Sequence, residues 1–176
     1  MKTRVLYPGT FDPVHYGHLD LMNRAALLFE ELVIGVYDHN QPTKSLLFSV
    51  DERMSMIEEA MASRKNITIA CYSSLTVDFA NKVGAQAILR GLRVFSDFEF
   101  EFRLALANKR LAPEIETISL MTQEEHTFLS STTVREIASL GGDISSMVPP
   151  HVHRALKTQL AGRNGDEYNR PVPLRD

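Results

Sequence analysis

The chain has 176 residues, 44% of them hydrophobic and 23% charged, which fits one globular domain with a full hydrophobic core. Its net charge is −3 with lysines and arginines spread along the chain, which argues against nucleic acid as the main partner, and the single cysteine, Cys71, excludes an internal disulfide. No apolar run approaches the ~20 residues that span a bilayer, and no signal-peptide pattern follows Met1, so we expect a cytoplasmic protein without a membrane anchor.

Short apolar runs alternate with helical patterns along the chain. We predict strands at residues 3–7, 32–37, 67–71, 86–90 and 116–121. We predict helices at residues 17–29, 50–62, 75–82, 98–109, 131–139 and 149–160. This alternation implies right-handed crossovers between parallel strands. The predicted fold is therefore α/β, a single Rossmann-like domain with a five-stranded, mostly parallel sheet and helices on both faces.

Local signals refine this outline. Ser49 and Glu52 have the spacing of a capping box and predict the start of the second helix. Cys71 lies in an apolar-rich segment, so we expect a buried thiol. The polar, irregular end of the chain divides it into a domain at 1–161 and a flexible tail at 162–176.

The first candidate site segment is residues 7–18, Tyr-Pro-Gly-Thr-Phe-Asp-Pro-Val-His-Tyr-Gly-His, between the first strand and the first helix. Ligands of open α/β sheets bind at the carboxyl ends of strands, and a helix N-terminus there offers N–H groups to phosphate. Gly17 allows close approach, and the imidazoles of His15 and His18 can donate to a phosphoryl oxygen. The alternative is that His18 caps the helix and His15 is a surface residue, and this short motif alone leaves both open.

Cationic side chains follow two further predicted strands. Lys44 lies in the loop after the second strand, where it could neutralise phosphate or be a solvated surface residue. Arg90 and Arg93 flank a turn after the fourth strand, and their planar guanidinium groups suit phosphate oxygens. The alternative for both arginines is a structural salt bridge with a carboxylate that follows them: Asp97, Glu99 or Glu101.

Hydroxyl residues cluster before the helix predicted at 131–139. Four in a row, from Ser130 to Thr133, exceed the single residue that an N-cap needs. Their hydroxyls and the free N–H groups of the helix could hold a polyphosphate. The chain has neither a G-x-x-x-x-G-K-[ST] loop nor a G-x-G-x-x-G motif, which excludes a P-loop enzyme and a standard dinucleotide-binding protein.

The H-x-G-H motif after the first strand and the S-S-T-x-x-R stretch before a late helix together resemble the nucleotidylyltransferase superfamily. Class I aminoacyl-tRNA synthetases share the first motif, but they are much longer and carry a lysine-rich signature that is missing here. Within the superfamily, the chain is similar to the bacterial phosphopantetheine adenylyltransferases over residues 3–160. The motifs that carry this resemblance are Tyr7–Pro13, Gly17-His18, Arg90–Arg93, Asp97–Glu101 and Leu129–Thr132.

This resemblance implies a reaction in coenzyme A biosynthesis. ATP and 4′-phosphopantetheine would give dephospho-coenzyme A and pyrophosphate by direct in-line attack on the α-phosphorus, without a covalent enzyme intermediate. The attacking phosphate is already ionised, so positioning and charge stabilisation would suffice without a general base. Two alternatives remain open: a sister enzyme that uses nicotinamide mononucleotide or glycerol phosphate, and a nucleotide-binding sensor without catalysis.

The resemblance also implies which residues act. The catalytic residues would be Thr10, His18, Lys44 and Arg93. His18 would stabilise the pentavalent transition state, whereas His15 would have no catalytic role. The residues that bind ATP would be Thr10, Phe11, His18, Gly91, Leu92, Arg93, Glu101, His126, Thr127, Phe128, Leu129, Ser130, Ser131 and Thr132. The residues that bind 4′-phosphopantetheine would be Thr10, Lys44, Thr76 and Arg90.

Three further properties rest on the resemblance alone. Mg²⁺ would bridge the phosphates of ATP while keeping much of its water, so no residue of the chain is predicted as a metal ligand. Coenzyme A would be a feedback ligand. The chain would assemble as a homohexamer, a dimer of trimers.

Overall fold

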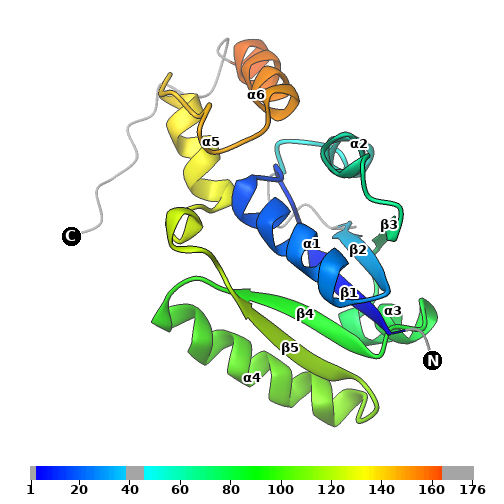
Figure 1. Cartoon of the computed structure of the whole chain (residues 1–176). Helices are drawn as coiled ribbons and strands as arrows, with labels where there is room; N and C mark the ends of the chain where they lie inside the picture. Colours follow the sequence, from blue (N-terminus) through cyan, green and yellow to red (C-terminus); the bar gives the residue numbers. More distant parts are fainter. Residues whose placement is uncertain (1–2, 39–45, 164–176) are drawn as a thin grey trace.

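The computed structural model of the protein describes residues 3–38 and 46–163 (Figure 1). Its centre is a sheet of five strands: β1 (Arg4–Gly9), β2 (Glu31–Tyr37), β3 (Ile67–Tyr72), β4 (Ala87–Leu92) and β5 (Glu116–Met121). The strands lie in the order β3-β2-β1-β4-β5, and each neighbouring pair is parallel. The α/β fold predicted from the sequence is confirmed.

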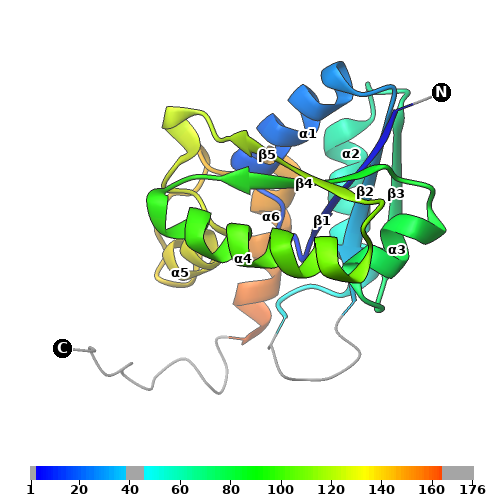
Figure 2. The same ribbon diagram turned by 90° about the horizontal axis from the view of Figure 1, so that it is seen from below.

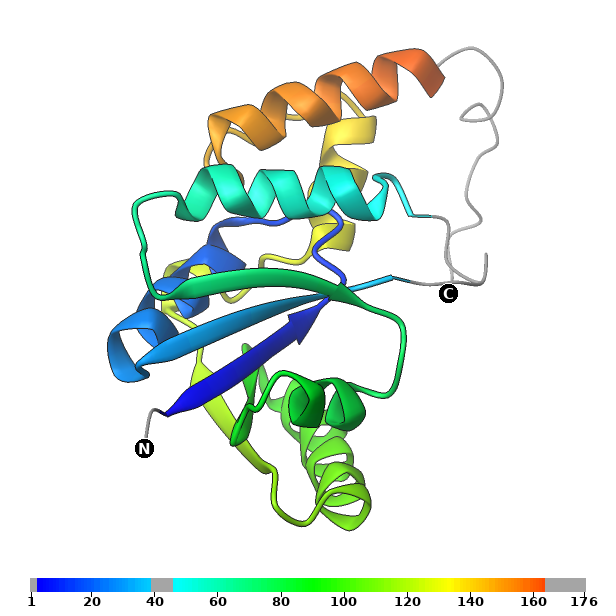
Figure 3. The same cartoon turned by 90° about the vertical axis from the view of Figure 1, so that its right-hand side faces the viewer.

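Helices cover both faces of this sheet (Figures 2 and 3). They are α1 (Tyr16–Leu28), α2 (Val50–Met61), α3 (Thr76–Lys82), α4 (Phe95–Leu111), α5 (Ser131–Ser139) and α6 (Pro150–Arg163). The helices α1 and α2 lie on one face, with α6 alongside α2, whereas α3 and α4 lie on the other. All of these helices were predicted within three residues of their bounds, but the short 3₁₀ turn η1 (Glu124–His126) was not.

The buried apolar side chains form two layers, one on each face of the sheet. The helices α1, α2, α5 and α6 contribute to one layer, and α3 contributes to the other. Among the described side chains, none from α4 belongs to either buried cluster. The predicted capping box is present, because Ser49 and Glu52 exchange hydrogen bonds at the start of α2.

One prediction about the sheet is wrong: the thiol of Cys71 is exposed. Its strand, β3, lies at the edge of the sheet, where neighbouring elements cover fewer side chains than they do on the central strand β1. An apolar-rich segment predicts a strand but does not say whether that strand is central or at the edge.

The winding direction of the chain reverses between β1 and β4. The chain adds β2 and β3 on one side of β1, and then β4 and β5 on the other. The pairing between β1 and β4 comprises only Val5 with Ala87 and Leu6 with Ile88, whereas β1 pairs with β2 over its whole length. The two central strands therefore separate toward their carboxyl ends. Open α/β sheets bind their ligands at such a reversal.

The helix α6 extends to Arg163, two residues past the predicted end of the domain, and the rest of the predicted tail lies outside the described residues. Across the ranges that the structure describes, no helix combines the length and apolar character needed to cross a membrane. The Nε2 atom of His151 lies 2.9 Å from the carbonyl oxygen of Met56, which joins α6 to α2. This contact fixes the last helix on the same face of the sheet as α2.

Candidate active site

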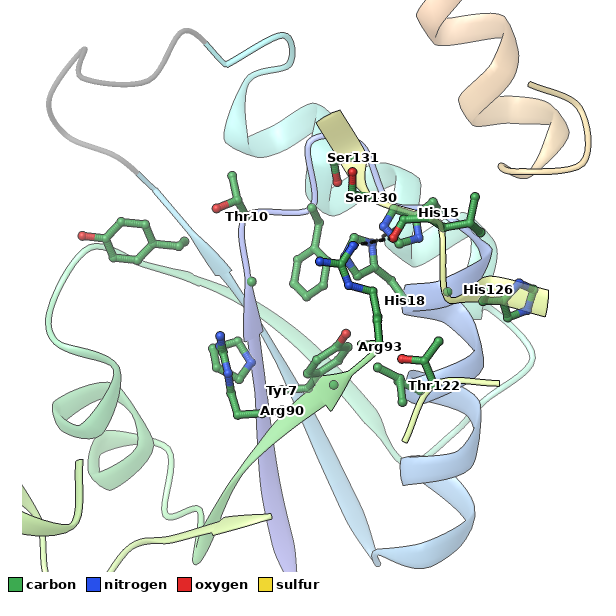
Figure 4. A pocket seen from close by; sticks show the side chains of 18 of the residues that line it. Tyr7, Thr10, His15, His18, Arg90, Arg93, Thr122, His126, Ser130 and Ser131 are labelled. Carbon is green, nitrogen blue, oxygen red and sulfur yellow. Dashed lines mark hydrogen bonds between the residues drawn. The ribbon is translucent and has the colours of Figure 1, made fainter. Parts of the chain in front are cut away.

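A cavity of about 470 Å³ lies at the carboxyl ends of β1 and β4, where these strands separate (Figure 4). Its walls come from β1, α1, the ends of β2 and β3, the start of α3, the end of β4 and the residue after it, α4 and the start of α5. Twelve of the predicted site residues line it: Thr10, Phe11, His18, Thr76, Arg90, Gly91, Arg93, Glu101, His126, Leu129, Ser130 and Ser131. The fold thus gathers segments that are far apart in the sequence around one space.

The other predicted site residues are not part of this wall. Leu92, Thr127, Phe128 and Thr132 lie outside the lining, and the side chain of Phe128 is 58% exposed. Because α5 begins at the cavity, only its first residues face inward, and Thr132 lies on the solvent side. Lys44 lies outside the described residues, so its role stays a prediction.

The turn after β1 presents Thr10 to the cavity through an unusual backbone. Phe11 has φ 51°, in the left-handed region of backbone conformation that residues other than glycine rarely adopt. Its ring folds back against Gly9, where a Cβ atom would lie only 2.7 Å from the ring atom Cζ. The same ring packs edge-on against Tyr7 and His18, at centroid distances of 5.5 and 5.0 Å. Glycine at position 9 is therefore a steric requirement of this turn.

His18 is a neutral imidazole in the cavity wall. Burial, and then the charge of Arg93, lower the pKa of His18 to about 3. The backbone N–H of His15 lies 3.4 Å from Nδ1 of His18, which therefore acts as the acceptor and leaves the proton on Nε2. A neutral ring with a protonated Nε2 can donate a hydrogen bond to a ligand.

His15 is not the surface residue considered from the sequence. It is buried, and its ring stacks on His18 at a centroid distance of 3.6 Å. Burial first, and then the neighbouring charges, lower the pKa of His15 well below its usual range. Within the part of the chain that the structure describes, its Nδ1 has no hydrogen-bond partner. This stacking fixes the orientation of the His18 ring.

Arg90 in β4 and Arg93 just after it both line the cavity and both form the salt bridges considered from the sequence. Arg90 binds both carboxylate oxygens of Glu101, at 2.6 and 2.7 Å. Burial opposes the charge of Arg90, but the hydrogen bonds and charge of Glu101 outweigh it and raise the pKa. Arg93 donates to Asp97 at 3.1 Å and to the carbonyl of Leu129 at 2.7 Å. These ion pairs hold two guanidinium groups in place at the cavity.

The N-terminus of α5 opens onto the same cavity. Ser130 is its N-cap and accepts a hydrogen bond from the N–H of Thr133 at 3.0 Å. Ser131 donates to the carbonyl of Pro13 at 2.9 Å, which joins α5 to the turn after β1. The free N–H groups of the first helical turn and the positive end of the helix dipole therefore lie beside Thr10 and His18.

Three functional residues were missed in the sequence. Thr122 lines the cavity directly after β5, and its buried hydroxyl has no partner among residues 3–38 and 46–163. Tyr72 lines it at the end of β3, with its hydroxyl 3.0 Å from that of Thr76. Both positions end a parallel strand, so applying the strand-end rule to every strand would have found them. Asp12 stands inside the first motif, but its role was not inferred.

Asp12 connects the turn after β1 to two other segments. Its buried carboxylate accepts hydrogen bonds from the N–H groups of Leu47 and Phe48, at 2.9 and 3.0 Å. It also pairs with Arg135 of α5 at 3.1 Å. A single carboxylate therefore ties the start of the site to the segment before α2 and to α5.

Comparison with known proteins gives consistent results. A family model described as cytidylyltransferase-like matches residues 6–137. A phosphopantetheine adenylyltransferase from Methylacidiphilum infernorum (isolate V4) is 50% identical over 165 residues, which cover 93% of this chain and 94% of that protein. One from Heliobacterium modesticaldum is 45% identical over 173 residues, which cover 98% of this chain and 99% of that protein.

A solved structure supports the fold independently. It comes from Vibrio parahaemolyticus and is assigned as a nicotinate-nucleotide adenylyltransferase. Its TM-score is 0.67 at 18% sequence identity, over 89% of this chain and 99% of its own. On the family match and the extent of the sequence identity, the chain belongs to the cytidylyltransferase-like family and, within it, to the phosphopantetheine adenylyltransferases.

Proposed function

We propose that the protein transfers the adenylyl group of ATP to 4′-phosphopantetheine, which yields dephospho-coenzyme A and pyrophosphate. The observation that carries this proposal is the cavity between β1 and β4, where a neutral imidazole, two held arginines and two helix N-termini converge. Such a set can bind and polarise phosphates. The relatives that share nearly the whole chain indicate the acceptor.

The reaction needs little acid–base chemistry from the protein. An oxygen of the acceptor phosphate, ionised at neutral pH because its second pKa is about 6, forms a bond to the α-phosphorus of ATP. The bond from that phosphorus to the bridging oxygen breaks on the opposite side, and pyrophosphate leaves with the electron pair. The protein positions the two substrates in line and stabilises the charge on the α-phosphoryl group.

In this proposal, His18 and Thr10 bind the α-phosphate. Neutral His18 donates from Nε2 as negative charge builds on the phosphoryl oxygen, and the partly closed cavity strengthens this hydrogen bond. A neutral donor also avoids the repulsion that an imidazolium would feel from Arg93 in the same wall. Thr10 adds its hydroxyl, and the backbone of Phe11 adds an N–H group.

The remaining assignments divide the cavity between the two substrates. Arg90 and Thr76 would bind 4′-phosphopantetheine, together with Lys44. ATP would contact the end of β4, α4 and the segment that leads into α5: Gly91, Leu92, Arg93, Glu101, His126, Thr127, Phe128, Leu129, Ser130, Ser131 and Thr132. The residues of this set that line the cavity support their assignment to ATP. Leu92, Thr127, Phe128 and Thr132 lie outside the lining, so they would have to contact ATP through the backbone.

The described part of the chain offers few candidate ligands for a divalent cation. Over residues 3–38 and 46–163, no group of three His, Cys, Asp or Glu side chains could hold a metal ion. Among the described residues that line the cavity, Glu101 is the only one with a carboxylate, and Arg90 binds it. Mg²⁺ would therefore enter as part of the substrate, bound to the phosphates of ATP and otherwise to water.

Coenzyme A contains the adenylyl and pantetheine parts of the product, so it would compete for the same cavity as a feedback ligand. The proposed location is the cytoplasm, where ATP is supplied.

We also propose that the chain assembles as a homohexamer, a dimer of trimers. Apolar side chains crowd one side of α4: Phe95, which is 89% exposed, stacks with Phe98, and Phe98 stacks with Phe102. An isolated soluble chain rarely exposes a patch of this kind. Contact between copies of α4 would bury it.

Sedimentation velocity tests this assembly. We expect a single species about six times the mass of one chain, because burial of the phenylalanine patch stabilises the contact. A Phe98→Lys variant should sediment as smaller species. Finding only monomer for the wild-type protein would contradict the proposal.

The acceptor is tested directly by pyrophosphate release. The protein is incubated with ATP, Mg²⁺ and one acceptor at a time: 4′-phosphopantetheine, nicotinamide mononucleotide or glycerol phosphate. We expect release with 4′-phosphopantetheine alone. Release with another acceptor would identify a sister enzyme, and ATP binding without any release would identify a sensor.

Replacing His18 by alanine separates catalysis from binding. Because its hydrogen bond strengthens only in the transition state, His18→Ala should lower kcat by at least about a hundredfold and change nucleotide affinity only a few-fold. The matched control is His153→Ala, since His153 lies on α6 outside the cavity lining. Equal losses in kcat and affinity would show that His18 has a structural role instead.

The neutral state of His18 also makes stability depend on pH. Its pKa is about 3 in the fold against 6.5 ordinarily, so at intermediate pH the unfolded chain binds the extra proton. The free energy of unfolding therefore falls as the pH falls. We expect the wild-type protein to lose about 2 kcal/mol more than His18→Gln between about pH 7.5 and about pH 5, measured by urea unfolding. Equal losses would mean that His18 is charged in the fold.

A further inference from the structure

The side chain of Arg53 on α2 is fully buried, with 0% exposure, and does not line the cavity. Its Nη1 donates to the carbonyl of Thr10 at 2.6 Å and to that of Tyr37 at 2.9 Å, and its Nε donates to the carbonyl of Ser49 at 3.3 Å. In the described ranges it forms no salt bridge. One guanidinium group therefore holds the ends of β1 and β2 and the N-cap of α2 together.

This arrangement carries an energetic cost. Burial lowers the pKa of Arg53, although the charges of Asp12 and Asp38 oppose that shift. Its Nη2 lacks a hydrogen-bond partner within residues 3–38 and 46–163. Buried charges are expensive, and hydrophobic side chains of similar volume often fill such places at least as stably. Stability alone is thus a poor reason for an arginine here.

The geometry of one peptide unit gives a better reason. The bond between Thr10 and Phe11 is trans, so its carbonyl and its N–H point in opposite directions. Arg53, which lies on α2 and outside the cavity lining, donates a hydrogen bond to the carbonyl of Thr10. The N–H of Phe11 is therefore directed to the other side, where Thr10 and Phe11 line the cavity. The left-handed backbone at Phe11 is strained and needs such a contact to persist.

We propose that Arg53 is a positioning residue for adenylyl transfer. It fixes the peptide unit between Thr10 and Phe11 so that the N–H of Phe11 and the hydroxyl of Thr10 meet the phosphates of ATP. Arg53 does not touch the substrate. The proposal rests on the proposed function, because it assigns Arg53 to the phosphate subsite of that reaction.

The first test is the variant Arg53→Lys. The lysine side chain keeps the charge but has a single ammonium group, which does not reproduce the planar fork between the three carbonyls. We expect Arg53→Lys to lower kcat/KM for ATP by about tenfold to a hundredfold, as for a small misplacement of reacting groups. The control is Arg64→Lys, because Arg64 binds Asn23 away from the cavity and its replacement should leave kcat/KM unchanged.

A double-mutant cycle separates positioning from general destabilisation. If Arg53 acts through Thr10, Thr10→Val should lower kcat/KM much less in the Arg53→Lys background than in the wild-type background. A structural role gives the same factor in both backgrounds and a lower Tm, and that result would overturn the proposal. Unchanged kcat/KM in Arg53→Lys would overturn it as well.

A measurement on the wild-type protein covers the case in which Arg53→Lys does not fold. Labelling Thr with ¹³C at the carbonyl and Phe with ¹⁵N selects two peptide units, Thr10-Phe11 and Thr127-Phe128. A Phe128→Leu variant assigns the two NMR signals. We expect the amide of Phe11 to shift when ATP is added, and the absence of a shift would overturn the proposal.

The two proposals fail in different ways. If the wild-type protein binds ATP but releases no pyrophosphate with 4′-phosphopantetheine, the proposed function fails. If it releases pyrophosphate but Arg53→Lys matches it in kcat/KM, only the role of Arg53 fails.

Discussion

Two buried charges of opposite sign hold the turn between β1 and α1, and the rest of the site depends on them. The carboxylate of Asp12 accepts hydrogen bonds from the N–H groups of Leu47 and Phe48, and Arg53 donates to the carbonyl of Thr10. Truncating either side chain would leave buried partners unsatisfied, at a cost of several kcal/mol. The position of Thr10 is thus set by the interior of the protein and not by a surface loop.

In the cavity, too, charged side chains are paired with groups of opposite charge. Arg90 and Arg93 are each paired with a carboxylate, so the cations are oriented before any phosphate arrives. Guanidinium groups that are already oriented toward the cavity need no reorganisation when negative charge develops on the phosphate during the reaction. The neutral state of His18 fits this design, because the positive charge of Arg93 would repel an imidazolium at that position.

Most of the fold could be predicted from the sequence because strands and helices alternate with clear periodicity. The candidate segments follow from motifs at strand ends, whereas the full set of wall residues was implied by the family resemblance. Burial was harder to predict. The spacing of Arg53 from Val50, Met56 and Ile57 places it on the apolar face of α2, but a charged side chain does not by itself predict burial, and its partners are backbone carbonyls that the sequence does not reveal. The exposure of Cys71 depends on strand order, which arises only once the sheet is assembled.

The early separation of β1 and β4 has a consequence for aggregation. Beyond Leu6 and Ile88 the facing sides of these strands no longer pair with each other, which creates two strand edges inside the sheet. Exposed edges invite pairing with another chain. Here the edges open into the cavity, which is lined by side chains such as Tyr7, Phe11 and Arg90. Backbone groups are thus available to a small ligand, and the side chains around them disfavour pairing with another strand.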